Sequence, residues 1–250
     1  MVAALPLILT GATLRRQGKT LIGPVDLTLG RIGVTVVIGP NGSGKTSLLR
    51  MMHGLQRTAD GRVGWSVADA IARERQAYVF QRPIALRRSV LANLMFPLRL
   101  RGASRAQAEV QARAIADRFD LSAMLAQPAP SLSGGEMQRL ALARALITEP
   151  EILFADEPCA ALDGQATRQI GQKKAIAAKE EEIEALLAGT ASAGTRLVMA
   201  THDMGQARRL ASDVIFLLHG RIHETGPAET FFAAPATPEA QAFLNGDIVE

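Results

Sequence analysis

Apolar runs alternate with helical patterns along much of this chain of 250 residues. Aliphatic, strand-forming residues gather at 33–40, 151–158 and 195–203, and again at 212–222, where the run contains its own turn. The first of these runs ends in Gly-Pro, and the segment SLLRMMHGL that soon follows has helical spacing. Strands that alternate with helices predict a mostly parallel sheet covered on both faces, with ligands at the carboxyl ends of its strands.

The segment 83–147 has a different pattern, in which no strand is visible. Residues 104–119 are strongly helical, and Ser104 is suited to cap that helix. Residues 127–131, QPAPS, predict a proline-broken loop. We therefore interpret 83–147 as a helical subdomain inserted into an α/β core that is formed by 1–82 and 148–250.

Two further segments bear on the fold. The N-terminal stretch 1–16 is apolar, and its basic residues follow the apolar part, whereas a secretory signal has them before it. We therefore interpret this stretch as a strand that enters the core. Residues 171–189 are rich in Ala, Lys and Glu, with a thin apolar stripe of Ile176, Ile183 and Leu187. This pattern predicts an exposed helix, and a solvated extension is favoured over a partner-binding helix.

Composition narrows the choice of partners. The net charge of +4 suits an anionic ligand, a nucleic acid, a membrane surface or merely a solvated surface, and no dense Lys/Arg block is present. Aromatic residues make up only 4% of the chain, so base stacking is poorly supplied and we expect no nucleic acid partner. Cys159 is the single cysteine, which excludes an intrachain disulfide and a multi-cysteine zinc site. No apolar run approaches the roughly 20 residues of a membrane span, and we expect a cytoplasmic protein.

The clearest chemical motif is GPNGSGKT at 39–46, which matches G-x-x-x-x-G-K-[ST] between a strand and a helix. Asn41 to Thr46 would surround a β-phosphate with backbone N–H groups, Lys45 would reach the β- and γ-phosphate oxygens, and the Thr46 hydroxyl would bind Mg²⁺. An ordinary glycine turn is the alternative, and the strand, Lys and Thr in register argue against it. The candidate nucleotide-binding residues here are Gly39, Pro40, Asn41, Gly42, Ser43, Gly44, Lys45, Thr46 and Ser47.

Polar side chains follow three other strands. Asp156, at the end of ILFAD, is placed to hold Mg²⁺ through its water shell, and Glu157 is expected to point to the other side of the strand and to activate water. His202 ends the run MATHD and is a candidate γ-phosphate contact. Gln81 follows YVF and is a candidate contact to Mg²⁺ and water. Taken singly, these would be solvated acids, a structural histidine and a loop-capping glutamine.

A second predicted anion site lies at 132–146, LSGGEMQRLALARAL, where a polar glycine-bearing loop runs into an amphipathic helix. Backbone N–H groups and the helix dipole point the same way at such a helix start. This site has no lysine of its own, which suits a ligand that is held elsewhere.

Five motifs together resemble those of the ATP-binding cassette (ABC) ATPases, in the same order: GPNGSGKT, VFQRP, LSGGEMQRLALARAL, ILFADEPCAALD and MATHD. The resemblance extends from about Leu14 to the C-terminal region. It implies a P-loop NTPase (RecA-like) α/β core with an N-terminal β subdomain and an inserted α-helical subdomain. It also implies a homodimer that encloses two ATP molecules, in which Ser133, Gly134 and Gly135 contact the ATP held by Lys45 of the other copy, with Asp163 at the interface.

The sequence departs from the family pattern in three places. The aromatic residue that usually stacks on adenine near the N-terminus is absent, and Leu14 is the nearest candidate. Cys159 replaces the usual Thr, Ser or Phe, a change expected to be harmless. The gap from Asp163 to His202 is longer than usual, and the excess falls in the Ala/Lys/Glu-rich helix.

Among functional classes, the LSGGE motif argues against a P-loop kinase or GTPase. A single short cassette resembles the separate ATPase subunit of an importer, which implies permease subunits, a solute-binding protein and a peripheral location on the inner face of the cell membrane. The segments 86–102 and 201–217 resemble those of tungstate- or phosphate-type oxyanion importers. An exporter or cell-division ATPase, or a soluble ABC ATPase of DNA repair or translation, stays open as an alternative.

Overall fold

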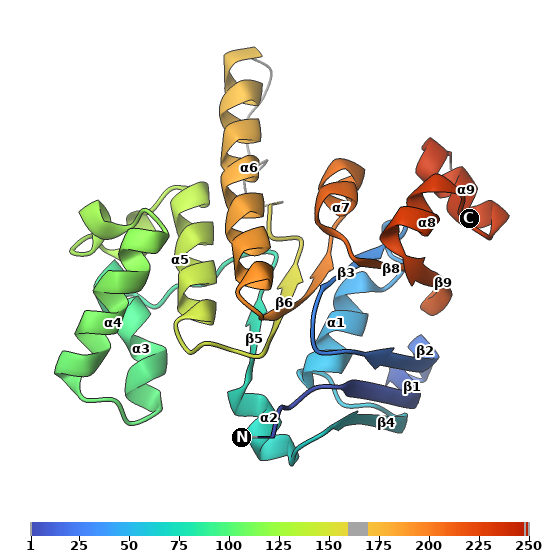
Figure 1. The fold of residues 1–250 in the computed structure, drawn as a ribbon, viewed down its shortest axis with the longest axis horizontal. Coiled ribbons are helices and arrows are strands. Elements are labelled where there is room, and N and C mark those ends of the chain that lie inside the picture. The colour runs from blue at the N-terminus through green and yellow to red at the C-terminus, as the bar shows by residue number, and fades with distance from the viewer. Residues whose placement is uncertain (1, 160–169, 248, 250) are drawn as a thin grey trace.

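A six-stranded sheet with strand order β5-β6-β7-β3-β8-β9 lies at the centre of the fold (Figure 1). The computed structural model describes residues 2–159, 170–247 and 249, so Asp163 lies outside the described residues. The strands are β3 (Val34–Ile38), β5 (Gln76–Val79), β6 (Ile152–Asp156), β7 (Arg196–Ala200), β8 (Asp213–Leu218) and β9 (Arg221–Pro227). All pairings are parallel except that of β8 with β9, which form a hairpin. The predicted mostly parallel sheet is confirmed.

Both faces of this sheet are buried, as its near-continuous apolar strands require. Successive side chains of a strand point to opposite faces, so Val36 and Ile38 join one hydrophobic cluster while Val37 joins the other. The same division separates Leu153 from Phe154 on β6. The sheet is therefore the shared wall of two cores.

One face is covered by α1 (Lys45–His53) and by a three-stranded antiparallel sheet of order β2-β1-β4. Its strands are β1 (Leu7–Arg16), β2 (Lys19–Leu29) and β4 (Asp60–Trp65), and α2 (Asp69–Glu74) leads from β4 into β5. The expected N-terminal strand is confirmed as β1, which pairs with both of the other strands. Helix α1 contacts both sheets and so joins the loop at its start to the core.

On the other face, the core is shared by the helices that follow β6 and, beside the β5 edge, by a group of helices that lie between β5 and β6 in the sequence (Figure 1). These are α3 (Val90–Leu100), α4 (Arg105–Arg118) and α5 (Gly134–Leu146), with short 3₁₀ turns at Ser122–Met124 and Ala129–Ser131. The predicted cap is confirmed, because the Ser104 hydroxyl accepts from Gln107 N and the Gln107 side chain accepts from Ser104 N. Within 83–147, all of which is described, strand-like pairing is limited to one isolated bridge between Ser89 and Pro128.

Helix α6 (Ile170–Ser192) corrects one expectation. Ile183 and Leu187 are buried in the core beneath it, with exposed fractions of 1% and 0%. The Arg209 guanidinium of α7 (Met204–Leu210) makes two hydrogen bonds to the Glu184 carboxylate, at 2.8 and 2.7 Å. The C-terminal half of α6 is thus a packed core helix, and the predicted solvated extension is wrong for it. Residues 177–179 are exposed, and in Figure 1 the N-terminal part of α6 extends beyond the neighbouring helices.

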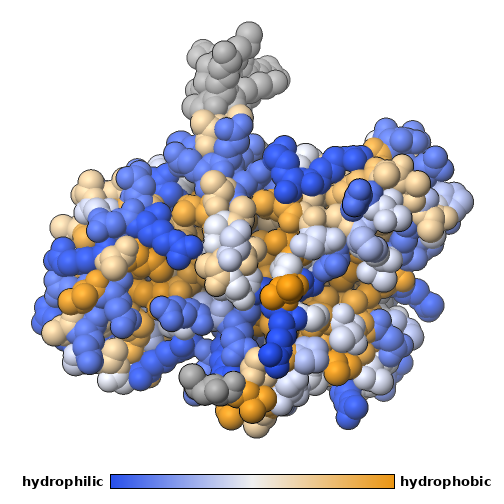
Figure 2. Space-filling model, in the orientation of Figure 1, coloured by the Kyte–Doolittle hydropathy of each residue, from blue (hydrophilic) through white to orange (hydrophobic). Residues whose placement is uncertain are grey.

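Two short helices, α8 (Ala228–Ala233) and α9 (Pro238–Asn245), end the described chain. Phe231 is buried, and its ring centroid lies 6.4 Å from that of Phe216 in β8, so this contact anchors the C-terminal helices to the core. Figure 2 shows hydrophilic residues over the outer rim of one face of the molecule, with hydrophobic residues visible between the elements. Among the described residues, no helix combines the length and the apolar character needed to cross a membrane.

The packing of α6 can be tested by substitution. We expect Leu187→Ala to lower the free energy of unfolding by about 2–5 kcal/mol, because it leaves a cavity in the core. Denaturant unfolding followed by circular dichroism measures this change. Lys179→Ala, in the exposed part of the same helix, is the control and should change stability by no more than about 0.5 kcal/mol. Equal small effects of both substitutions would show that α6 does not depend on this core.

Candidate active site

The loop 39–44 joins the end of β3 to the start of α1, and its backbone shape requires glycine. Gly39 has φ 148°, and a Cβ atom there would lie 2.1 Å from the Leu217 carbonyl oxygen. Gly44 caps α1 with φ 104°, a left-handed conformation that favours glycine. The Ser43 Oγ is buried without a hydrogen-bond partner among the described residues. The loop therefore forms a tight cradle with a free polar atom at a helix N-terminus.

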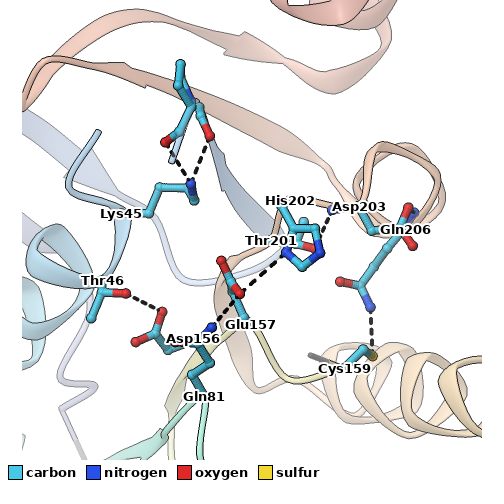
Figure 3. Close-up of polar contacts among 12 residues, drawn as sticks. Lys45, Thr46, Gln81, Asp156, Glu157, Cys159, Thr201, His202, Asp203 and Gln206 are labelled. Carbon is cyan, nitrogen blue, oxygen red and sulfur yellow. Dashed lines mark hydrogen bonds and ion pairs between the residues drawn. The ribbon is translucent and has the colours of Figure 1, made fainter. Parts of the chain in front are cut away.

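Lys45 is the first residue of α1 and folds back over this loop. Its Nζ donates hydrogen bonds to the carbonyl oxygens of Gly39, at 2.8 Å, and Pro40, at 3.1 Å (Figure 3). Burial lowers the pKa of the Lys45 ammonium, and the nearby carboxylates of Glu157 and Asp156 partly offset that effect. The Lys45 ammonium thus places a positive charge inside the loop, near the carboxylates of Glu157 and Asp156.

Asp156 ends β6 and is almost fully buried, with an exposed fraction of 1%. Its Oδ1 accepts from the Thr46 hydroxyl at 2.9 Å, and its Oδ2 accepts from the Tyr78 hydroxyl at 3.1 Å. Burial raises the pKa of the Asp156 carboxyl, while the two hydroxyl donors act in the opposite direction. The structure therefore brings together Thr46 and Asp156, two of the three residues that the sequence predicts to contact Mg²⁺.

Glu157 is held by two side chains from other strand ends (Figure 3). Gln81 Nε2 donates to Glu157 Oε2 at 2.7 Å, and His202 Nδ1 lies 3.4 Å from the same oxygen. β6 ends at Asp156, and Glu157 adopts a left-handed backbone with φ 46°. Its orientation therefore comes from a turn and not, as expected, from strand alternation. The three residues predicted to be catalytic lie together.

The position of His202 is fixed by the start of α7. Asp203 caps this helix by accepting from Gln206 N, and Asp203 N donates to the Thr201 hydroxyl. Gln206 Nε2 also lies 3.0 Å from Cys159 Sγ, which ties the helix to the segment after Glu157 (Figure 3). Burial raises the pKa of the Cys159 thiol to about 12, so this thiol stays protonated.

The second predicted anion site lies apart from the first. Ser133 caps α5, and its backbone N–H donates to Glu136 Oε2 at 2.7 Å in a capping box. Ser133 and Gly134 are exposed, and Gly135 is buried. Among the described residues, no hydrogen bond or ion pair joins this loop to 39–47, and Figure 1 shows α5 and α1 separated by β6 and α6. One copy of the chain therefore does not bring its two predicted phosphate contacts together.

Leu14 does not match the role expected for it. Its side chain is 5% exposed and packs in the cluster beneath the N-terminal sheet, so it cannot stack on a base. Its neighbours Arg15 and Arg16 are exposed instead. Regular strand alternation does not explain this burial, because Ala12, Thr13 and Leu14 are all buried and the pairing of β1 with β2 shifts register on both sides of Leu14.

Sequence reasoning missed Tyr78, whose hydroxyl reaches the Asp156 carboxylate. A signal was present, because this is the only tyrosine of the chain and it lies in the short strand that ends before Gln81. What the sequence did not show is that β5 pairs with β6, which places Tyr78 opposite Phe154.

The sequence of this chain is similar to those of known proteins. A family model described as ABC transporter matches residues 22–160. The phosphate import ATP-binding protein PstB 2 of Natronomonas pharaonis is 34% identical over 93% of this chain and 84% of its own length. The tungstate uptake ATP-binding protein TupC of Peptoclostridium acidaminophilum is 35% identical over 86% and 94%, and the nickel import protein NikO of Rhodobacter capsulatus is 38% identical over 95% of each chain.

Solved structures share the fold. One, a part of the CbiONQ transporter complex of Clostridium perfringens, has a TM-score of 0.77 at 22% identity and covers 97% of this chain and 96% of its own. Another is a dimeric ATP-binding cassette in a post-hydrolysis state, bound to ADP and Pi, with a TM-score of 0.73 at 27% identity over 89% and 98%. The expected P-loop NTPase fold is confirmed, and the family model matches more than half of the chain. This chain therefore belongs to the ABC transporter family and is an ATPase of the kind that serves import systems.

Proposed function

We propose that this ATPase hydrolyses ATP at the carboxyl ends of β3, β6 and β7, and that the site residues have the roles that the sequence predicts for them. The ATP phosphates lie over the loop 39–46, where backbone N–H groups and the Lys45 ammonium meet them. The unpartnered Ser43 hydroxyl in this cradle supports the assignment. The observation that carries the proposal is that Lys45, Thr46 and Asp156 meet at one sheet edge with the Glu157 carboxylate.

Thr46 and Asp156 fit Mg²⁺ as the metal of this site. Their Oγ1 and Oδ1 atoms lie 2.9 Å apart, and both are the hard oxygen donors that Mg²⁺ prefers. Mg²⁺ in nucleotide sites is commonly held by one or two carboxylates together with substrate phosphates, and among the described residues no group of three or more His, Cys, Asp or Glu side chains could hold a metal ion by itself. When bound at Thr46 and Asp156, Mg²⁺ would neutralise the negative charge that develops on the phosphate oxygens during hydrolysis. The amide of Gln81, which now reaches Glu157, is the third proposed metal contact.

Glu157 serves as the general base for the attacking water. Both of its described side-chain contacts, with Gln81 and His202, use Oε2. This holds the carboxylate in one orientation and leaves Oε1 to accept a proton from water. His202 is 55% exposed, which suits the proposed contact with a γ-phosphate that arrives from solvent.

Two copies complete each site. Because α5 stands apart from α1 within one chain, we propose that Ser133–Gly135 of one copy meet the γ-phosphate held by Lys45 of the other. The exposed helix N-terminus of α5 supports this, since its dipole favours an anion. The dimeric state of a related cassette bound to ADP and Pi also supports it. Asp163 is assigned to the same interface by resemblance alone.

The wider assembly follows from the import relatives. We propose that the chain acts as the ATP-hydrolysing subunit bound to permease subunits at the inner face of the cell membrane, together with a solute-binding protein. The segment 83–147 would be the signature subdomain that carries motion to the permease, and 1–82 with 148–250 the nucleotide-binding core. The names of these relatives refer to import of phosphate, tungstate and nickel at 34–38% identity, so identity does not select a cargo. An oxyanion such as tungstate is our proposed cargo, on the resemblance of 86–102 and 201–217.

The base is tested by Glu157→Gln. We expect turnover to fall by at least about a hundredfold, because the amide cannot take up the proton. MgATP should then trap a dimer, which size-exclusion chromatography with light scattering detects. Glu229→Gln, an exposed acid on α8, is the control and should hydrolyse ATP normally. Wild-type turnover in Glu157→Gln would remove this residue from its role.

The phosphate cradle is tested by Lys45→Ala. We expect ATP to bind about ten- to a hundredfold more weakly, because a charge-assisted contact with the phosphates is lost. Isothermal titration calorimetry measures this, with Lys179→Ala as the control for charge. Unchanged ATP affinity in Lys45→Ala would contradict the cradle.

Action between copies is tested with mixed dimers. In the Glu157→Gln background, a dimer of one Ser133→Arg chain and one Ser133 chain should retain one ATP, because only one composite site is blocked. Native mass spectrometry counts the bound nucleotides, and the unmixed Glu157→Gln dimer should retain two. Two ATP molecules in the mixed dimer would show that Ser133 does not cap a partner's nucleotide.

A further inference from the structure

The side chain of Tyr78 lies on the same sheet face as Asp156. In the parallel pairing of β5 with β6, Tyr78 is the register partner of Phe154. Asp156 follows Phe154 by two residues, so both point to the same face of the sheet. The two rings are stacked at 21° with centroids 6.5 Å apart, and the Tyr78 hydroxyl lies 3.1 Å from Asp156 Oδ2. Strand pairing therefore aims the hydroxyl along β6 at the carboxylate.

Residues of helix α1 also interact with Tyr78 and Asp156. Thr46, Arg50 and His53 are spaced four and three residues apart, so they share one face of the helix. His53 meets the Tyr78 ring edge-on, with centroids 5.4 Å apart and an interplanar angle of 83°. Burial lowers the pKa of His53 to about 4, so this contact is with a neutral imidazole at neutral pH. The positive charge of Arg50 acts on both the Tyr78 hydroxyl and the Asp156 carboxylate.

The Tyr78 ring is thus held in place independently of its hydroxyl. Phe80 packs against it with centroids 4.7 Å apart, in addition to the contacts with His53 and Phe154. A ring fixed on three sides presents its hydroxyl at one point. The two oxygens of Asp156 then have different partners, with Oδ2 toward Tyr78 and Oδ1 toward Thr46.

This division matters because the terminal torsion of an aspartate is broad and roughly two-fold. A carboxylate with one partner can rotate, whereas one that is bonded at both oxygens cannot without losing a buried hydrogen bond. Groups that hydrogen-bond a metal-binding carboxylate in this way set its orientation and so the affinity of the site.

We propose that Tyr78 is a positioning residue for the metal-binding carboxylate: its hydroxyl holds Oδ2 of Asp156 and thereby presents Oδ1, beside Thr46, to the metal ion. This rests on the proposed assignment of Thr46 and Asp156 as the Mg²⁺ site. Tyr78 itself touches neither substrate nor metal, so it acts on metal affinity and leaves the phosphate cradle unchanged.

The test is Tyr78→Phe, which removes the hydroxyl and keeps the ring. Mn²⁺ serves as a paramagnetic probe, and its binding to the complex of the protein with the non-hydrolysable analogue AMP-PNP is followed by electron paramagnetic resonance. We expect the Mn²⁺ dissociation constant to rise by about tenfold, as for other groups that orient metal ligands. Binding of AMP-PNP in EDTA should not change, and this split separates positioning from a general loss of structure.

Three further variants fix the interpretation. Tyr78→Met also lacks the hydroxyl and should give the same change, which keeps the test available if the phenylalanine variant folds poorly. Phe80→Leu removes one of the three ring contacts and keeps the hydroxyl, so it should weaken Mn²⁺ binding much less than Tyr78→Phe does. Asp156→Asn reports on the metal site itself and should weaken Mn²⁺ binding more than either Tyr78 variant.

The outcomes separate the two proposals. Normal Mn²⁺ binding in Asp156→Asn would overturn the proposed metal site. Weakened binding in Asp156→Asn together with normal binding in both Tyr78 variants would overturn only the positioning role. An equal loss in Phe80→Leu and Tyr78→Phe would show that ring packing, and not the hydroxyl, holds the carboxylate.

Discussion

The alignment of parallel strand ends is the constraint on which the rest of this site depends. β7 lies between β3 and β6, and its Ala200 is the register partner of both Val37 and Asp156. This pairing places the start of the phosphate loop, the buried acid and the segment that leads to His202 at one edge of the sheet. No single strand carries the chemistry, because each supplies one or two side chains at its carboxyl end. A shift in any one of these registers would move its polar residues into the core.

A buried carboxylate is stable only with hydrogen-bond donors, and this chain supplies them from two directions. Thr46 comes from α1 and Tyr78 from β5, and each bonds one oxygen of Asp156. The buried ammonium of Lys45 adds a favourable charge nearby. The phosphate loop, α1 and two strands are thus linked through one acid, so changes in any of them reach the proposed metal-binding position.

The second predicted anion site lies elsewhere in the chain, before α5. The loop there precedes a helix N-terminus, has exposed residues and contains no lysine. Such a site is weak alone and becomes useful when another copy brings a phosphate that is already held. In the proposed dimer, the nucleotide is therefore part of the interface, and hydrolysis removes a contact that holds the two copies together. Two hydrogen bonds between Arg209 and Glu184 hold α7 to α6, and they thereby link the helix that follows His202 to the core.

The sequence by itself determined the elements whose causes are local. The glycine loop and its lysine, the alternating apolar strands and the Ser104 cap all follow from neighbouring residues, and each is confirmed as a structural element. The motifs placed Gln81, Asp156, Glu157 and His202 at strand ends, and parallel pairing then made their proximity predictable. Only the tertiary structure decided the rest: the burial of Leu14, the packing of Leu187 under α6, the turn that orients Glu157 and the reach of Tyr78 to Asp156. The reason is physical, because periodicity shows which face of an element is apolar, whereas the neighbours of that face depend on register and packing between segments far apart in the chain.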